Sequence, residues 1–349
     1  MSILITGGLG FIGCNAARRF MGHGEEVLVL DNFSRPGSLQ NMEWLRSQGP
    51  VTVIGADIRD AGRMRDIFRQ HRDITLVLHL AAQVAVTTSV IDPRGDFEVN
   101  ALGTLNVLEA MRLSGVDAPL IYSSTNKVYG QMEDLEIVDT GGRYAYKTLA
   151  SGVPETRPLD FHSPYGCSKG AAEQYVRDYH RIFGLKTFVF RQSCIYGYRQ
   201  FGVEDQGWVA WFMIASVLKR PLTIYGDGKQ VRDVLFIEDL VDAFEAVASN
   251  SSLASGTIYN MGGSSKNTLS LIELLSYIEE RTGAPVEYSV APARPGDQLV
   301  YISDTTKAEH ELNWKPRIGC DKGLQLLYDW VNRNKHEFEN GHSKIAAVA

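Results

Sequence analysis

Short apolar runs, rich in β-branched residues, alternate with longer amphipathic stretches through the first half of the chain. Runs of this length predict buried strands, and the stretches between them repeat their apolar positions with a helical period. The predicted strands are 3–6, 27–31, 51–54, 75–80, 119–123 and 186–191. The predicted helices are 11–21, 60–70, 97–114 and 165–183. Because this alternation is typical of a parallel sheet covered by helices, we predict an α/β fold with a doubly wound, Rossmann-type parallel sheet.

The rhythm becomes irregular after residue 191. Loop-like stretches at 196–206 and 225–230 precede predicted helices at 237–248 and 269–281. A chain of 349 residues exceeds the size at which one hydrophobic core usually stops growing, so two domains are expected. We predict a first domain over 1–190 that is rejoined by 231–262, a smaller C-terminal α/β domain over 191–230 and 263–335, and a flexible tail over 336–349.

Composition and charge narrow the classes of function. The chain is 44% hydrophobic and 22% charged, as in an ordinary globular protein, and its net charge of −6 argues against a nucleic-acid partner. Four scattered cysteines form no CxxC pair or His/Cys cluster, which argues against a disulfide framework and a metal site. No apolar run is long enough to span a membrane, and Arg18 and Arg19 follow the first apolar stretch, the reverse of a secretory signal. These features predict a cytoplasmic protein without a membrane partner.

A glycine-rich turn lies between the first predicted strand and the first predicted helix. Gly7, Gly10 and Gly13 allow a tight turn and a close approach of a pyrophosphate to the backbone at a helix N-terminus. Asp31 ends the second predicted strand, where an acidic residue binds the adenosine ribose, and this favours NAD over NADP. Arg35 weakens that preference, because a nearby arginine can accept a 2′-phosphate, although a place on a solvated loop explains it equally well.

Tyr165 and Lys169 are four residues apart, downstream of Ser123 and Thr125. On a helix they share one face, so the ammonium group can lie beside the phenol and lower its pKa. Tyr165 would then remove a proton from a substrate hydroxyl held by Thr125, while a nicotinamide accepts hydride. The spacing alone is also typical of simple surface packing, so these residues need support from the rest of the chain.

That support is a resemblance to a known family over nearly the whole length of the chain. The chain resembles the extended short-chain dehydrogenase/reductase family of nucleotide-sugar enzymes. The matching segments are the glycine turn, 57–58, 79–83, Asn100, 128–130, 165–169, 226–228 and 232–233.

The resemblance implies roles for individual residues. Tyr165 is expected to be the active-site base, Thr125 its hydroxyl partner and Lys169 a ligand of the nicotinamide ribose. The expected NAD contacts are Gly7, Gly10, Phe11, Ile12, Gly13, Asp31, Asn32, Ser34, Arg35, Asp57, Ile58, Leu80, Ala81, Ala82, Asn100, Ser123, Tyr165, Lys169 and Gln192. The expected contacts to a nucleotide-diphosphate sugar are Thr125, Asn126, Ser193, Gln200, Arg232 and Arg294.

The two arginines in that set are assigned to the diphosphate. Arg232 and Arg294 lie in segments similar to the diphosphate-binding segments of the family, and arginine suits phosphate through bidentate contacts. Without the resemblance, either is better explained as an exposed surface arginine.

The residues after Thr125 distinguish among the family's reactions. Family members that eliminate water resemble Thr-Asp-Glu at this point, whereas this chain has Asn126 and Lys127. Asparagine cannot act as an acid, and lysine reverses the charge of glutamate, so elimination is disfavoured. Oxidation, rotation of the ketone and return of the hydride remain, which is epimerisation.

Finer likeness, over 123–130, 160–172, 199–201, 205–209 and 228–235, is to the subfamily that inverts C2 of CDP-hexoses of the paratose and tyvelose type. We therefore expect a CDP-hexose as the substrate. The chain departs from that subfamily at Tyr198, where relatives have proline or glycine. A tyrosine there is large enough to narrow or reshape the sugar pocket, which leaves the exact hexose open.

Three alternatives remain open at this stage: a dehydrogenase that releases NADH, a UDP-hexose 4-epimerase, and a non-catalytic NAD-sensing protein. The resemblance also implies a homodimer or homotetramer, paired through the helices that begin near Phe97 and Tyr165.

Overall fold

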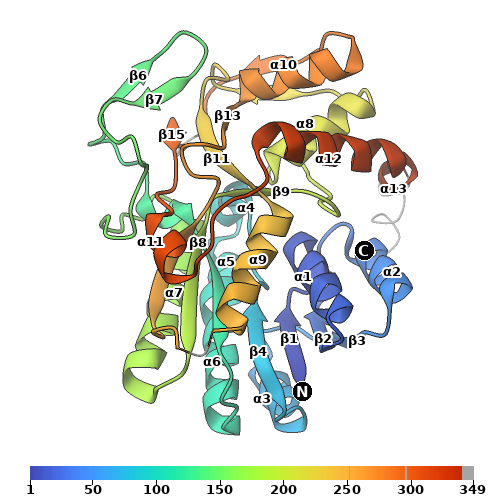
Figure 1. Cartoon of the computed structure of the whole chain (residues 1–349), viewed down its shortest axis with the longest axis vertical. Coiled ribbons are helices and arrows are strands. Elements are labelled where there is room, and N and C mark those ends of the chain that lie inside the picture. The colour runs from blue at the N-terminus through green and yellow to red at the C-terminus, as the bar shows by residue number, and fades with distance from the viewer. Residues whose placement is uncertain (251, 295–296, 340–349) are drawn as a thin grey trace.

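Seven parallel strands form the centre of the molecule, with helices on both faces (Figure 1). The computed structural model describes residues 1–250, 252–294 and 297–339. The strands lie in the order β12-β8-β5-β4-β1-β2-β3. Their bounds are β1 Ser2–Thr6, β2 Glu26–Asp31, β3 Thr52–Gly55, β4 Ile74–His79, β5 Leu120–Thr125, β8 Thr187–Gln192 and β12 Thr257–Met261.

Six of the strands are largely buried on both faces, which explains why they read as continuous apolar runs, whereas the edge strand β3 is only partly buried. In β1, Ile3 and Ile5 pack into one hydrophobic cluster while Leu4 packs into another on the opposite face. The first cluster contains side chains of α1 (Phe11–Gly22), α2 (Ser38–Gln48) and α9 (Ile237–Ala248). The second contains side chains of α3 (Ala61–Gln70), α6 (Gly103–Ser114) and α7 (Pro164–Phe183). The predicted doubly wound α/β fold is confirmed.

The six predicted strands and six predicted helices all exist, with ends displaced by a few residues. The stretch 97–114 is divided into a π-helical turn, η1 (Glu98–Leu102), and α6. Several helices were not predicted: α2, α4 (Val86–Ile91), α5 (Pro93–Phe97), α8 (Trp208–Val217), α11 (Thr306–Glu311) and α12 (Cys320–Arg333). In α8 the residues are almost uniformly apolar, so no helical period distinguishes a buried face from an exposed one.

The rest of the chain builds smaller sheets above the carboxyl ends of the large sheet's strands (Figure 1). One sheet joins β9 (Cys194–Tyr196), β11 (Val231–Phe236), β13 (Thr268–Ser270) and β15 (Val300–Tyr301). The other described elements are the 3₁₀ turn η2 (Asn126–Tyr129), the paired strands β6 (Ile137–Asp139) and β7 (Tyr144–Tyr146), the paired strands β10 (Thr223–Tyr225) and β14 (Ser289–Ala291), and helix α10 (Leu271–Thr282).

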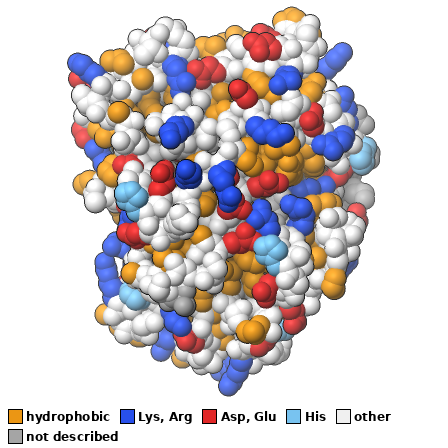
Figure 2. All heavy atoms as spheres, viewed as in Figure 1, with side chains coloured by type: hydrophobic (Ala, Val, Ile, Leu, Met, Phe, Trp, Pro, Cys, Tyr) orange, Lys and Arg blue, Asp and Glu red, His pale blue; other side chains and the backbone are white. Residues whose placement is uncertain are grey.

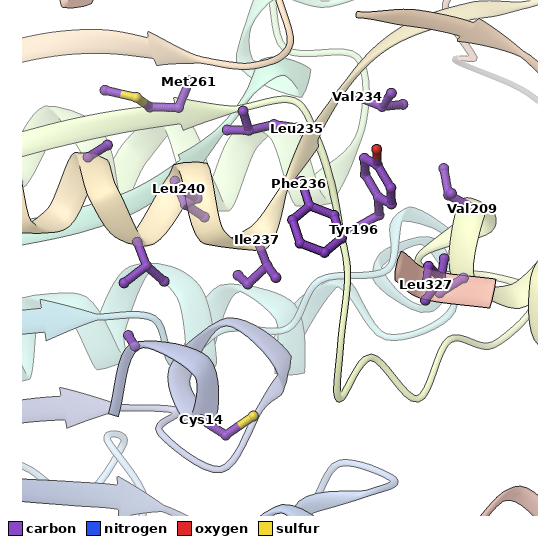
Figure 3. Close-up of a cluster of buried hydrophobic side chains, with 14 of the residues drawn as sticks. Cys14, Tyr196, Val209, Val234, Leu235, Phe236, Ile237, Leu240, Met261 and Leu327 are labelled. Atoms are coloured by element: carbon purple, nitrogen blue, oxygen red, sulfur yellow. The ribbon is translucent and has the colours of Figure 1, made fainter. Parts of the chain in front are cut away.

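The stretch 231–262 is shared between the two parts of the molecule. Its first strand, β11, belongs to the small sheet, whereas α9 packs beside α1 and β12 pairs with β8. The chain therefore returns to the large sheet at α9 rather than at residue 231. Figure 3 shows the hydrophobic cluster at this point, where Ile237 and Phe236 lie between Cys14 of α1 and the side chains of the smaller part.

The predicted tail over 336–349 is wrong for its first residues. Helix α13 spans Lys335–Glu339, and Phe338 is buried against Phe201 and Trp330. Glu337 accepts a 2.8 Å hydrogen bond from Arg199. These contacts join α13 to the loop after β9, and residues 340–349 lie outside the described residues.

Basic and acidic side chains are interspersed over the face drawn in Figure 2, and no broad patch of a single sign gathers among the side chains described there. This distribution fits the negative net charge.

Candidate active site

A cavity of about 630 Å³ opens at the carboxyl ends of the strands in the large sheet. In open parallel sheets this is the edge at which ligands bind. The predicted site residues that line it are Gly7, Gly10, Phe11, Ile12, Gly13, Asp31, Asn32, Ser34, Arg35, Asp57, Ile58, Leu80, Ala81, Ala82, Ser123, Thr125, Tyr165, Lys169, Gln192, Ser193 and Gln200. The remaining four predicted residues, Asn100, Asn126, Arg232 and Arg294, lie outside this wall.

The glycine turn is built so tightly that side chains do not fit. Gly7 has φ +66°, and a Cβ there would lie 2.7 Å from the backbone nitrogen of Ala81. A Cβ on Gly13 would lie 2.4 Å from the carbonyl oxygen of Gly7. Helix α1 begins directly after Gly10, and no side chain caps its first turn. The free N–H groups and the helix dipole therefore suit an anion such as a pyrophosphate.

Asp31 connects the end of β2 to the glycine turn. Its Oδ2 accepts a 3.0 Å hydrogen bond from the N–H of Leu9, and its Oδ1 accepts one of 2.8 Å from the N–H of Phe33. Burial raises the pKa of Asp31, and these N–H groups act in the opposite direction. Asp31 therefore holds the glycine turn in place and still lines the cavity, where its remaining lone pairs suit ribose hydroxyls.

Arg35 points across the cavity rather than out from a solvated loop. Its guanidinium donates to Oε1 of Gln206, which lies in the loop after β9. Burial lowers the pKa of Arg35, and the phenol of Tyr165 acts in the opposite direction. The arginine therefore lies near the proposed base and bridges the two halves of the cavity wall.

Tyr165 and Thr125 meet at the inner end of the cavity. Tyr165 lies in the first turn of α7, which Ser163 caps by accepting from the N–H of Gly166. Burial raises the pKa of Tyr165 to about 12, against the lowering effects of a hydrogen bond with Thr125 and of the Arg35 charge.

The pKa of Tyr165 is raised rather than lowered, contrary to what its pairing with Lys169 led us to expect. Lys169 is held against β5. Its ammonium donates a 2.5 Å hydrogen bond to the carbonyl oxygen of Ser123 and lies 4.3 Å from the ring centre of Tyr122. Burial lowers the pKa of Lys169 to about 7, while Asp96 and Glu173 act to raise it. The lysine thus lines the cavity as a buried group that titrates near neutral pH.

Asn100 supports the site from outside the wall. It accepts a 2.9 Å hydrogen bond from the N–H of Gln83 and donates to Ser168 and Asp96 at 3.0 and 3.1 Å. Asp96 also accepts from Ser168, beside Lys169 in α7. Asp96 was not predicted, because nothing in the sequence places it near residue 168. Gln83 belongs to the segment 79–83, which the sequence had already linked to the family.

The remaining predicted substrate residues lie on the side toward the small sheet. Arg232 donates a 2.6 Å hydrogen bond to Asp297, and Asn126 contacts Gln298 at 3.5 Å. Arg294 pairs with Asp205 at 3.0 Å, and its guanidinium lies 3.9 Å from the ring centre of Tyr225. The structure therefore does not bring the two arginines together on one shared partner.

Tyr198 does not shape the cavity. Its ring packs edge-on against Phe236 at 5.2 Å, and its carbonyl oxygen accepts a 2.9 Å hydrogen bond from Asn15. Among the described residues, the cavity wall contains Arg199 and Gln200 but not Tyr198. These contacts place Tyr198 behind the cavity wall.

The chain as a whole is similar to known proteins. A family model for GDP-mannose 4,6 dehydratase matches residues 4–327. CDP-paratose 2-epimerase of Salmonella typhi is 43% identical over 337 residues, covering 95% of this chain and 99% of that protein. The chain belongs to the NAD-dependent epimerase/dehydratase family.

Solved structures of the family superpose over almost the whole chain. A UDP-glucose 4-epimerase from Thermotoga maritima with UDP-glucose is 32% identical, covers 96% of this chain and 100% of its own, and has a TM-score of 0.83. A Thermus thermophilus UDP-glucose 4-epimerase in complex with NAD is 33% identical with a TM-score of 0.80, and covers 96% of this chain and 100% of its own. The family is one of NAD-dependent nucleotide-sugar enzymes, and the glycine turn and Asp31 described above fit that cofactor.

The described residues contain neither a candidate metal cluster nor a candidate membrane span. Within 1–250, 252–294 and 297–339, no three His, Cys, Asp or Glu side chains are grouped so as to hold a metal ion. Over those same residues, none of the helices combines the length and apolar character that crossing a membrane requires.

Proposed function

We propose that this enzyme inverts C2 of a CDP-hexose of the paratose or tyvelose type, with NAD kept bound. The observation that carries the proposal is the pair Asn126 and Lys127 directly after Thr125, in the turn η2. Elimination would need carboxylates at these positions, and this chain has an amide and an ammonium group instead. The 43% identity to a CDP-paratose 2-epimerase supports the same reaction.

Tyr165 removes the proton of the C2 hydroxyl, and Thr125 holds the same oxygen through its own hydroxyl. NAD, when bound, supplies the group that accepts hydride from C2 and gives it back. The 2-keto sugar then turns in the cavity, and Tyr165 returns the proton as hydride reaches the other face. The overall reaction is balanced, because no oxidant is consumed and only the configuration at C2 changes.

Burial leaves Tyr165 protonated at neutral pH in the unliganded protein, so its activation needs positive charge near the phenol. Arg35 already acts in that direction. Lys169, held by the carbonyl of Ser123, provides a second cation in its protonated form. We assign it to the nicotinamide ribose and to stabilising the phenolate.

The test is incubation of the purified enzyme with a panel of CDP-, UDP- and GDP-hexoses, followed by NMR of the products. We expect turnover of a CDP-hexose with inversion at C2 and no net formation of NADH. Inversion at another carbon, or loss of water from the sugar, would contradict the proposal.

A UDP-hexose 4-epimerase is the second candidate. It is favoured by the 32–33% identity to two UDP-glucose 4-epimerases over almost the full chain. The same Tyr165 and Thr125 would serve either reaction, so the inverted carbon in the product distinguishes the two.

We also propose that the enzyme is a homodimer or homotetramer located in the cytoplasm. Exposed apolar side chains on neighbouring helices support the assembly: Phe97 at the end of α5, Leu102 in η1, and Tyr175, Ile182 and Phe183 in α7. An apolar face of this kind suits a protein partner. Four free cysteines fit a reducing compartment.

A further inference from the structure

Lys127 replaces a carboxylate next to the reaction centre, and nothing described so far uses its charge. The residue lies in η2, where its backbone N–H donates a 3.2 Å hydrogen bond to Oγ1 of Thr125. The position of Lys127 is thus fixed relative to the hydroxyl that orients the substrate. Its side chain is mostly buried, with 22% of its surface exposed.

The ammonium group of Lys127 and the guanidinium of Arg232 share a single carboxylate. Oδ1 of Asp297 lies 3.5 Å from Nζ of Lys127 and 2.6 Å from Nη2 of Arg232. Burial opposes ionisation of Asp297, yet Arg232 and Lys127 together lower its pKa below the usual value. One negative charge therefore faces two positive charges, and the group as a whole carries an excess of one positive charge.

Of the two cations, Lys127 has the longer and weaker contact with Asp297. An ammonium group has three donors, and its contact with Asp297 at 3.5 Å is long for a charge-assisted hydrogen bond. Burial lowers the pKa of Lys127, and the nearby Arg232 charge lowers it further. A second anion beside Lys127 and Arg232 would offset the repulsion between their two positive charges.

Lys127, Arg232 and Asp297 lie behind the wall of the main cavity rather than in it. Thr125, which accepts a hydrogen bond from the backbone of Lys127, and Cys194 both line that wall. Burial raises the pKa of the Cys194 thiol, while the charges of Arg232 and Lys127 act to lower it. Ser193, beside Cys194 in the wall, donates its hydroxyl to Asp233, next to Arg232. The two cations thus stand at the boundary between the cavity and the small sheet.

We propose that Lys127, with Arg232, binds the sugar-side phosphate of the substrate and so determines which carbon reaches Tyr165. The inference rests on the proposed function, because it assumes a nucleotide-diphosphate sugar. Lys127 is bonded through its backbone to Thr125, so the phosphate that it holds must lie close to the reacting hydroxyl. In a nucleotide sugar, C2 is bonded to the carbon that carries the phosphate, whereas C4 lies on the far side of the ring. Lys127 is therefore a specificity-determining residue for oxidation at C2.

The test compares a nucleoside diphosphate with the corresponding monophosphate, because only the diphosphate carries the sugar-side phosphate. We would measure the affinities of CDP and CMP by calorimetry for the NAD-loaded wild type and for Lys127→Met. CDP should bind the variant at least about tenfold more weakly, while CMP binds within about twofold of wild type. Lys127→Arg should recover most of the lost CDP affinity, since it keeps the charge.

The matched control is Lys186→Met. Lys186 also forms an ion pair, at 2.8 Å with Asp117, but it lies at the opposite end of the strands. The Lys186→Met variant should bind CDP and CMP with the same affinities as the wild type. Thermal unfolding of each variant checks that the protein is folded. Unchanged CDP affinity in Lys127→Met, or an equal loss of CDP and CMP affinity, would overturn the assignment.

This test can fail separately from the proposed function. If CDP does not bind, the same comparison is made with UDP and UMP and with GDP and GMP. A selective loss of diphosphate affinity with UDP or GDP would refute the CDP preference and still support the phosphate role of Lys127. Binding of CDP with no selective loss would refute the role of Lys127 and leave the CDP preference standing.

Discussion

Ser124 donates a 2.8 Å hydrogen bond to Oε2 of Glu173, which joins the end of β5 to the middle of α7. Glu173 is fully buried, and its carboxylate also pairs with Arg191 of β8, which is 2% exposed, at 2.5 Å. Thr125 follows Ser124 on the strand, and Lys169 lies one helical turn before Glu173. The buried pair therefore fixes the strand that carries Thr125 against the helix that carries Tyr165 and Lys169.

Removing the charge of Glu173 should be strongly destabilising. Glu173→Gln would leave the Arg191 guanidinium buried without its counter-ion, and such a loss costs about 3–5 kcal/mol. Urea denaturation would measure the free energy of unfolding. The exposed pair of Lys186 and Asp117 supplies the control, since Asp117→Asn should cost less than about 1 kcal/mol. A similarly small loss for Glu173→Gln would contradict the role given to the buried pair.

Tyr165→Phe should reduce kcat by about 100- to 10,000-fold, because the variant lacks the hydroxyl group that moves the substrate proton. NAD should stay bound, since the glycine turn and Asp31 are untouched. Turnover is followed by NMR of the sugar, and the cofactor is measured by absorbance after heat release. Near-normal turnover would refute the assignment of Tyr165 as the base.

Asp31 should make the protein prefer NAD to NADP. A 2′-phosphate would lie beside a carboxylate whose position is fixed by two backbone N–H groups. We expect NADP to bind at least about tenfold more weakly than NAD, as measured by calorimetry on protein stripped of cofactor. Equal affinity for the two cofactors would mean that Arg35 outweighs Asp31.

The buried Lys169 should give stability a distinctive pH dependence. Its pKa is about 7 in the folded protein against an ordinary value of 10.5, so the unfolded chain binds more protons between pH 7 and about 10. The free energy of unfolding therefore rises with pH in this window, by at most about 1.4 kcal/mol per pH unit from this group. Lys169→Met should lack this rise in the free energy of unfolding. Urea denaturation at pH 7 and at pH 9 would compare the variant with the wild type. Parallel pH dependences would contradict a lowered pKa.

The proposed assembly depends on the exposed apolar residues of α5, η1 and α7. Ile182 is 66% exposed near the end of α7 and Phe97 is 54% exposed at the end of α5. The double variant Phe97→Asp/Ile182→Asp should dissociate into monomers, because it buries two charges in the interface. Sedimentation velocity would measure the change, with Val290→Asp as a control on an exposed residue of the small β10/β14 sheet. A wild-type protein that sediments as a monomer would exclude the assembly.

The large sheet was predictable from the sequence because its strands are buried on both faces and therefore read as unbroken apolar runs. Gly7 to Gly13 were predictable because the turn and the helix start are contiguous in sequence, and Asp31 was predictable because it ends the next apolar run. Helix α8 was missed because its residues are apolar all round. Helix α13 was missed because two of its contacts, Phe338 with Phe201 and Glu337 with Arg199, are made with a distant part of the chain.

The catalytic geometry was predicted in part. The sequence indicated that Tyr165, Lys169 and Thr125 belong together, because helical spacing and the family motif are both local signals. It gave the wrong origin for the pKa of Tyr165, because burial and the approach of Arg35 depend on the folded chain. The sharing of Asp297 between Lys127 and Arg232 was equally hidden, since 170 residues separate Lys127 from Asp297.

The pairing of β12 with β8 means that the cofactor-binding part cannot be separated as a fragment. A chain ending at residue 190 would leave β8 as an open edge, with its N–H and C=O groups available to other chains. It would also expose the face of α1 that α9 covers, including Cys14 in the cluster of Figure 3. The nucleotide-binding sheet is completed only after the small sheet's first two strands, β9 and β11, have been made, so nascent chains pass through a long stage with an unprotected edge.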